Sequence, residues 1–207
     1  MQRGSDAFTG RLATGVALTG FVSVLSLGLF FAVQGPFGAI NDWTVGILGL
    51  LSGLLAWRLA RRGTGQPQVI GSPALVAATV GALIVVVGAA LVISRTTGFL
   101  LAGLVESLGF AMIGVWLVSF NRQIRSTAAV PRWLPALGIT AGIVMAVGFV
   151  VAPGVLMRLD DMNTAPGWVW IGFVGWLGIF FLYPVWSLWL GRAREGRAET
   201  GGADVAR

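Results

Sequence analysis

Cysteine and histidine are both absent from this sequence of 207 residues, and all 14 basic residues are arginine. The lack of cysteine excludes disulfides, thiol redox chemistry and thiolate metal sites. The lack of histidine removes the commonest transition-metal ligand and the usual acid–base group near neutral pH. We therefore expect neither a metal site nor a cofactor in this chain.

Enzyme motifs are missing as well. The sequence has no phosphate-binding G-x-x-x-x-G-K-S/T loop and no H-E-x-x-H zinc motif. A serine nucleophile would have neither histidine nor lysine as its base. We also expect no pair of acids inside the membrane for two-metal or aspartyl chemistry. These absences predict a protein that is not an enzyme.

Charge is scarce: 11% of residues are charged, against about 25% in an ordinary soluble domain. Instead, 56% are hydrophobic and the mean hydropathy is +0.86. A helix needs about 20 residues to cross ~30 Å of hydrocarbon. Apolar segments near or above this length cover residues 12–34, 43–59, 74–94, 98–120, 134–157 and 168–190, and 43–59 is marginal.

These segments predict an all-α, polytopic membrane protein, with a single six-transmembrane-helix bundle over residues 1–191 and a disordered tail over 192–207. The first apolar run exceeds the about 7–15 residues of a signal-peptide core, so we expect it to remain as a span. Gly35–Gly38 is expected to break the first helix at its outer end. Asn41–Trp43 is expected in the first outer turn, and Asn121–Arg132 in the longest inner loop.

Arginine placement predicts the orientation. Only Arg95 and Arg158 fall in the third and fifth connections, whereas the other arginines lie at the termini or in the second and fourth connections. Short cytoplasmic loops retain arginine, so both termini are expected in the cytoplasm, with Asp42, Asp160 and Asp161 outside. The net charge of +6 then favours anionic inner-leaflet lipids, at about 1 kcal/mol per arginine, and not nucleic acid.

Glycine and tryptophan are both placed as in a packed bundle. Small residues let membrane helices approach closely. We therefore expect intramolecular packing, with dimerisation as the alternative, at three small-residue faces: Gly49–Gly53, Gly138–Gly142–Ala146, and Gly172, Gly175 and Gly178.

Most tryptophans are expected in aromatic belts at the membrane surfaces: Trp43 and Trp168 outside, and Trp57, Trp116, Trp133, Trp186 and Trp189 inside.

Glu106 is the one acid deep inside a predicted span, at ~12 Å from its outer end. A carboxyl at such depth costs about 2.5 kcal/mol or more unless it is protonated, paired or hydrated. Counting to the same depth on the other spans gives a candidate buried polar site with these members: Glu106, Ser107, Ser23, Ser26, Ser52 and Trp176. The site is either a proton- or substrate-binding point or a structural acid hydrogen-bonded to a neighbour. A residue near lipid or a partner helix is the third alternative.

Tyr183 and Pro184 form a candidate bend in the last span. Proline removes a backbone hydrogen bond from a helix, and Ser187 or neighbouring side chains could satisfy the freed carbonyl. Such a bend can shape a cavity or act as a gate, although most membrane prolines simply bend helices.

The segments Pro131–Gly138, with Gly142, and Tyr183–Arg192 together resemble a broad group of uncharacterised bacterial six-helix membrane proteins, defined only as a domain of unknown function. The likeness covers the second half of the chain best. It implies a six-helix fold in a bacterial plasma membrane and provides no catalytic residues to transfer.

Two classes of function remain. The first is a non-enzymatic accessory or structural component of the plasma membrane, acting with a partner membrane protein or as a homo-oligomer. The alternative is a small transporter or substrate-binding membrane component with a buried polar site around Glu106. A tunnel or cavity that reaches Glu106 from outside would favour the alternative, whereas a solidly packed bundle in which Glu106 bonds one partner would favour the first.

Overall fold

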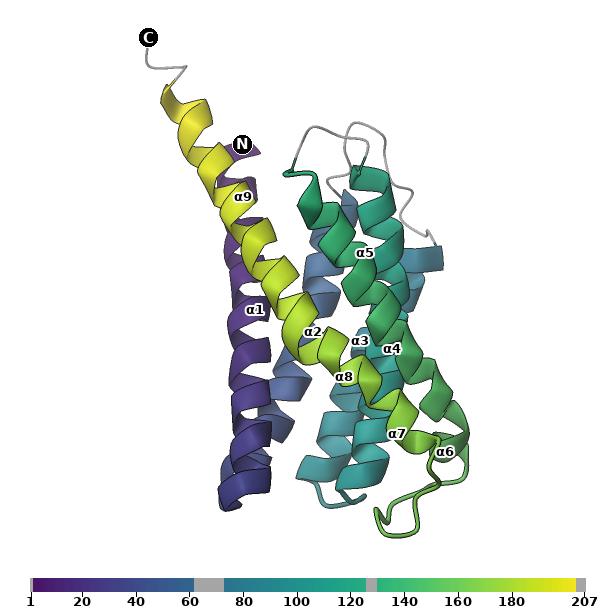
Figure 1. Cartoon of the computed structure of the whole chain (residues 1–207). Helices are drawn as coiled ribbons and strands as arrows, with labels where there is room; N and C mark the ends of the chain where they lie inside the picture. The colour runs from purple at the N-terminus through teal and green to yellow at the C-terminus, as the bar shows by residue number, and fades with distance from the viewer. Residues whose placement is uncertain (1, 62–72, 126–129, 204–207) are drawn as a thin grey trace.

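The computed structural model describes residues 2–61, 73–125 and 130–203, with side chains over 6–61, 73–125 and 130–196. All regular structure within these residues is helical. Six helical segments are long and apolar enough to cross a membrane (Figure 1). The predicted all-α, six-helix fold is confirmed.

The first four spans are single helices, α1 (Gln2–Val33), α2 (Phe37–Arg61), α3 (Pro73–Ile93) and α4 (Phe99–Ile124). The last two are irregular. The fifth span comprises α5 (Trp133–Ala146), the 3-10 turn η1 (Val147–Val151) and α6 (Ala152–Leu156). The sixth comprises α7 (Val169–Gly172), α8 (Val174–Leu177), the π-helical turn η2 (Gly178–Leu182) and α9 (Tyr183–Ala203).

Helices that follow one another in sequence pack against one another, and the sixth span closes the bundle by packing on both α5 and α1. The central helix is α4, since 61% of its most apolar stretch is buried, against 33% to 50% in the other spans. A group on the inward face of α4 therefore lies in the middle of the bundle.

Glycines let the backbones of neighbouring helices touch. A Cβ added to Gly109 of α4 would lie 2.6 Å from the carbonyl oxygen of Gly81 in α3, and one added to Gly142 of α5 would lie 2.6 Å from that of Gly114 in α4. The predicted small-residue faces also pack inside the bundle, with Gly49 and Gly53 on α3, Gly138 and Gly142 on α4, and Gly172, Gly175 and Gly178 on the fifth span.

The first helix ends close to the predicted break at Gly35–Gly38, and the turn there is shorter than expected. It consists of Gln34, Gly35 and Pro36, and the first two of these have positive φ angles of 63° and 75°. The carbonyl oxygen of Pro36 accepts the backbone N–H of Ile40 at 3.1 Å, so α2 starts directly after the proline. The prediction of a turn at Asn41–Trp43 is wrong, and Asn41 and Asp42 lie inside α2.

The ends of α4 and α9 also differ from expectation. Helix α4 continues to Ile124, so Asn121 is a buried helical residue and not the start of a loop. Helix α9 continues to Ala203, so the helix extends over residues 192–203 of the predicted tail, while 204–207 lie outside the described residues. An ion pair of 3.6 Å between Arg194 and Asp6 joins this part of α9 to α1.

The start of α1 and the end of α9 lie at the same end of the bundle, where α2 also ends and α3 begins (Figure 1). This arrangement follows from an even number of crossings. It places the two chain ends beside the second and fourth connections, and together these parts of the sequence carry 12 of its 14 arginines.

Candidate functional site

Glu106 projects from α4 toward α2, in the half of the bundle away from the chain ends. Its side chain passes over Gly88 of α3, where an added Cβ would lie 2.7 Å from Glu106 Cγ. The glycine therefore leaves room for the carboxyl group at a point where two helices are in close contact.

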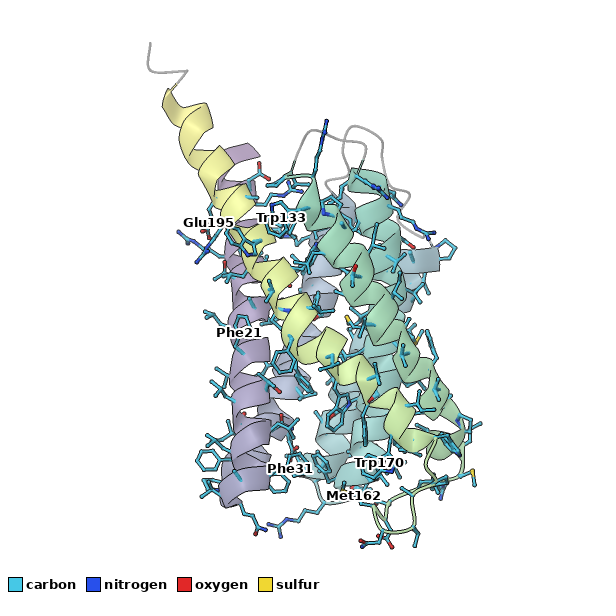
Figure 2. All side chains as sticks on the ribbon, viewed as in Figure 1. Phe21, Phe31, Trp133, Met162, Trp170 and Glu195 are labelled. Carbon is cyan, nitrogen blue, oxygen red and sulfur yellow. The ribbon has the colours of Figure 1, made fainter. Side chains whose placement is uncertain are left out.

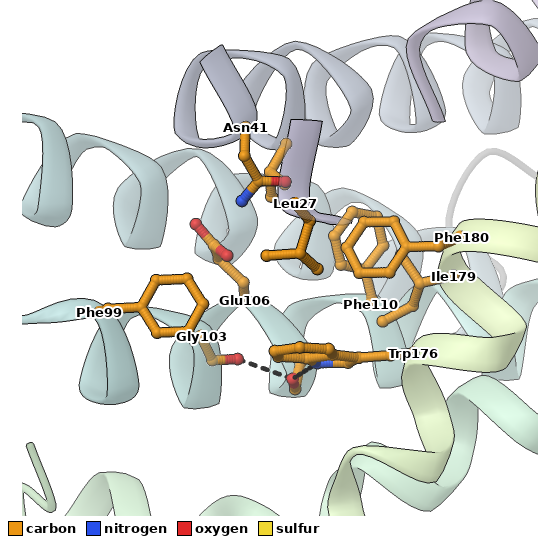
Figure 3. A pocket seen from close by; sticks show the side chains of 11 residues that line it. Leu27, Asn41, Phe99, Gly103, Glu106, Phe110, Trp176, Ile179 and Phe180 are labelled. Atoms are coloured by element: carbon orange, nitrogen blue, oxygen red, sulfur yellow. Dashed lines mark hydrogen bonds between the residues drawn. The ribbon is translucent and has the colours of Figure 1, made fainter. Parts of the chain in front are cut away.

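The carboxyl borders a small cavity of about 20 Å³, which is enough for a single water molecule. Asn41 and Glu106 point toward each other across it, with Trp176 on the opposite side (Figure 3). The rest of the lining is mostly apolar and comprises Leu27, Val45, Phe99, Gly103, Ser107, Phe110, Ile179 and Phe180.

A second carboxyl group, that of Asp42, lies near this site but does not line the cavity. It lies close enough to Glu106 for the two groups to interact electrostatically, and it also interacts with the side chain of Asn41. Asn41 accepts a hydrogen bond of 2.9 Å from Ser23 Oγ of α1. Contrary to expectation, Asp42 also lies within a helix of membrane-spanning length, near the start of α2.

Glu106 itself has no hydrogen bond or ion pair among the described residues. Trp176 Nε1, which was a candidate donor to the carboxyl, instead donates to Ser107 Oγ at 3.0 Å. Ser107 in turn donates to the carbonyl oxygen of Gly103 at 2.6 Å. The structure therefore brings Ser107 and Trp176 to the site but gives Glu106 no direct partner from either of them.

The remaining predicted serines divide into two groups. Ser23 reaches the site through Asn41, and Ser26 bonds within its own helix, to Val22 O at 2.5 Å and Ser23 O at 3.2 Å. Ser52 lies nearer the chain ends and donates to Leu48 O at 2.6 Å. Its predicted depth was wrong because α2 begins six residues before the predicted span, at Phe37.

Tyr183 and Pro184 lie directly after the π-helical turn η2, in which the N–H of Tyr183 donates to Gly178 O, five residues back. The Tyr183 hydroxyl faces Ser52 and Ser187. Within the described residues, however, neither Tyr183 Oη nor Ser187 Oγ has a partner in hydrogen-bond geometry. Ser187 therefore does not satisfy a freed carbonyl as expected.

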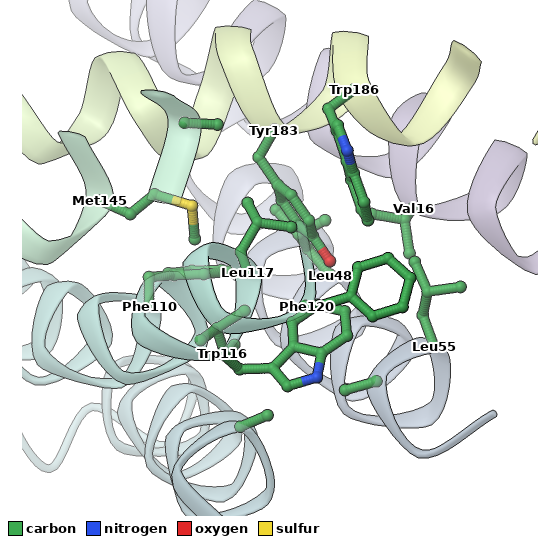
Figure 4. Packing of buried hydrophobic residues seen from close by; sticks show 14 of the residues in the cluster. Val16, Leu48, Leu55, Phe110, Trp116, Leu117, Phe120, Met145, Tyr183 and Trp186 are labelled. Atoms are coloured by element: carbon green, nitrogen blue, oxygen red, sulfur yellow. The ribbon is translucent and has the colours of Figure 1, made fainter. Parts of the chain in front are cut away.

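Asn121 and its partner Trp186 form a second polar contact, which the sequence did not indicate. Trp186 Nε1 donates to Asn121 Oδ1 at 3.0 Å, and Asn121 Nδ2 donates to Leu117 O at 2.8 Å. Trp116 meets the Trp186 ring edge-to-face in the same apolar core (Figure 4). The sequence did not indicate this contact because Asn121, followed by Arg122 and Gln123, was assigned to an inner loop.

The tryptophan belts are confirmed only in part. Trp43, Trp57, Trp133 and Trp189 are exposed on the outside of the bundle, and Trp133 and Trp170 lie toward opposite ends of it (Figure 2). Trp116 and Trp186 are only 2% and 0% exposed, so they are core residues and not belt residues. Trp168 is partly buried.

Asp160 has a structural role. Its carboxylate accepts the backbone N–H groups of Gly98 at 2.6 Å and Leu101 at 3.1 Å, at the N-terminus of α4. An acid there satisfies unpaired N–H groups and complements the helix dipole. Among the described residues, no group of three or more acidic side chains could hold a metal ion.

Comparisons with protein-family models, with curated proteins and with solved structures find no match to this chain. The resemblance to bacterial six-helix membrane proteins therefore stays a prediction. The argument for function rests on the geometry around Glu106.

Proposed function

We propose that this protein is a small, non-enzymatic transport component of a bacterial plasma membrane, which binds a proton at the carboxyl of Glu106, near that of Asp42. We infer from the arginine placement that both chain ends face the cytoplasm. One observation supports the transport proposal above all: Glu106 borders a water-sized cavity beside a second carboxyl and has no hydrogen-bond partner among the described residues.

The charges around Glu106 favour protonation of its carboxyl over an ion pair with a cation. Asp42 is the ionisable group that interacts electrostatically with Glu106, whereas α1 presents Leu27, α3 presents Gly88 and the sixth span presents Trp176. No cation in the described part of the site balances two negative charges, which repel. Protonation of Glu106 removes one of the two charges and provides an O–H donor.

The size of the cavity narrows the substrate class. A volume of about 20 Å³ accommodates one water molecule, whereas pockets for organic ligands measure about 300–1,000 Å³. The cavity thus has room for one water beside the Glu106 carboxyl and gives no support to an organic substrate.

Proton flux tests the proposal. Purified protein is placed in lipid vesicles that contain a pH-sensitive dye, and an imposed pH gradient is followed over time. We expect the wild type to dissipate the gradient and Glu106→Gln to behave like protein-free vesicles. Asp161→Asn, which removes one negative charge from an exposed loop, is the matched control and should retain the flux. Flux in Glu106→Gln equal to that of the wild type would overturn the proposal.

The tight packing favours a second candidate, the accessory role. Helices α3, α4 and α5 meet at backbone-to-glycine contacts, which suits a rigid element that supports a partner membrane protein. In that case the wild type itself would give no more flux than empty vesicles.

A further inference from the structure

An apolar groove runs along the outer face of α2 and α3, away from the Glu106 site. It consists of two adjoining hollows of about 320 and 370 Å³, which share Leu50 and Val86. The hollow nearer the chain ends, here called the inner groove, is lined by Leu50, Gly53, Leu54, Trp57, Thr79, Ala82, Leu83 and Val86. Trp43 and Ser94 line the far end of the other hollow.

Small residues create the groove. Gly53 packs directly on Ala82, where an added Cβ would lie 2.8 Å from the Ala82 Cβ. The larger side chains Leu54 and Leu83 project on either side and are 45% and 61% exposed. The small residues Gly53 and Ala82, with a larger apolar side chain on either side, form a narrow apolar groove that suits a hydrocarbon chain.

A positive charge stands at one end of the inner groove. The guanidinium of Arg61 lies 3.7 Å from the centre of the Trp57 ring, which lines the groove. Arg61 is exposed and forms no ion pair within the described residues. A guanidinium stacked on an aromatic ring keeps its N–H donors in its own plane, where they can bind phosphate oxygens in pairs.

We propose that the inner groove binds one anionic phospholipid, with an acyl chain between α2 and α3 and its phosphate on Arg61. The charge at the end of the groove favours a lipid over a helix of a second copy, because an apolar helix offers no anion to Arg61. The neighbouring Arg58 is directed elsewhere, with its guanidinium 4.5 Å from the Phe8 ring centre on α1.

Native mass spectrometry of the purified protein tests the site, with phosphatidylglycerol and zwitterionic phosphatidylcholine as probes. We expect the wild type to retain phosphatidylglycerol preferentially. Arg61→Gln should lose this preference, and Thr79→Trp, which fills the groove from an exposed position, should lose one bound lipid of either kind. The matched controls, Arg95→Gln and Leu25→Trp, alter an exposed arginine and an exposed apolar residue outside the inner groove and should behave as the wild type.

Wild-type lipid preference in Arg61→Gln, or wild-type lipid retention in Thr79→Trp, would overturn the proposal. A wild-type dimer that Thr79→Trp converts to monomer would also overturn it and would assign the groove to a second copy. Thr79 and Arg61 are surface positions, so both variants should fold, and circular dichroism checks that they do.

Discussion

At the scale of single residues, the buried polar groups differ in how well they are satisfied. Asn121 uses both ends of its amide, toward Trp186 and Leu117, and stabilises the core. Tyr183 Oη and Ser187 Oγ are buried without hydrogen-bond partners among the described residues. Unpaired buried groups cost free energy. The Glu106 carboxyl, in contrast, borders a small cavity.

This contrast gives a stability prediction. Asn121→Leu keeps a similar volume but leaves the Trp186 N–H buried without an acceptor, so the free energy of unfolding should fall by about 1–3 kcal/mol. Tyr183→Phe removes a hydroxyl that has no partner and should not lower it. Thermal unfolding in detergent, followed by circular dichroism, measures both variants. Equal losses in the two would contradict the assignment of their hydrogen bonds.

At the scale of helices, close approach through glycine determines which spans are neighbours. The sequence indicated these faces by their spacing, and Gly49, Gly53, Gly138 and Gly142 all pack inside the bundle. Spacing alone could not identify their partners, because 31 glycines offer many such patterns. Gly81 of α3 and Gly109 of α4, for example, are in close contact, although neither belongs to a small-residue pattern that the sequence indicated.

Gly142→Ala should therefore be destabilising, because its Cβ would lie 2.6 Å from the backbone oxygen of Gly114. Separating α4 from α5 to relieve such overpacking costs about 1–3 kcal/mol. The control is Gly28→Ala in α1, where an added Cβ has nothing within 4 Å. That substitution should be neutral or stabilising by up to about 1 kcal/mol. A Gly142→Ala variant as stable as Gly28→Ala would refute the close contact.

Helix boundaries were the weakest part of the sequence prediction, and they explain the errors at the site. Asn41 and Asp42 are polar residues near an apolar segment, which is the usual signature of a turn. They instead lie within α2, where Asn41 is 4% exposed and Asp42 is partly buried. This helix begins at Phe37, directly after Pro36 and six residues earlier than hydropathy indicated. Glu106, Ser107 and Trp176 were predictable because the outer boundaries of the fourth and sixth spans were nearly correct.

At the scale of the whole molecule, hydropathy and length were enough to predict six crossings, since lipid demands long apolar helices. Hydropathy could not reveal that acids on two different helices lie close enough to interact electrostatically. Such pairing depends on the rotation of each helix about its own axis, which the tight contacts at Gly88 and Gly109 fix.

The absence of cysteine makes the orientation testable with single introduced cysteines. Asn163→Cys lies in the exposed connection between α6 and α7, and Arg125→Cys lies at the opposite end of the bundle, after α4. In intact cells, a membrane-impermeant thiol reagent should label Asn163→Cys only, while both should react after lysis. Labelling of Arg125→Cys from outside would invert the proposed orientation.

Infrared spectroscopy tests the central claim about Glu106 most directly. A protonated carboxyl has a carbonyl stretch that is separate from the bands of carboxylates and amides. At neutral pH in lipid, the wild type should show this band, and Glu106→Gln should lose it while Asp161→Asn retains it. The account is contradicted if the wild type shows no such band, or if the band survives unchanged in Glu106→Gln.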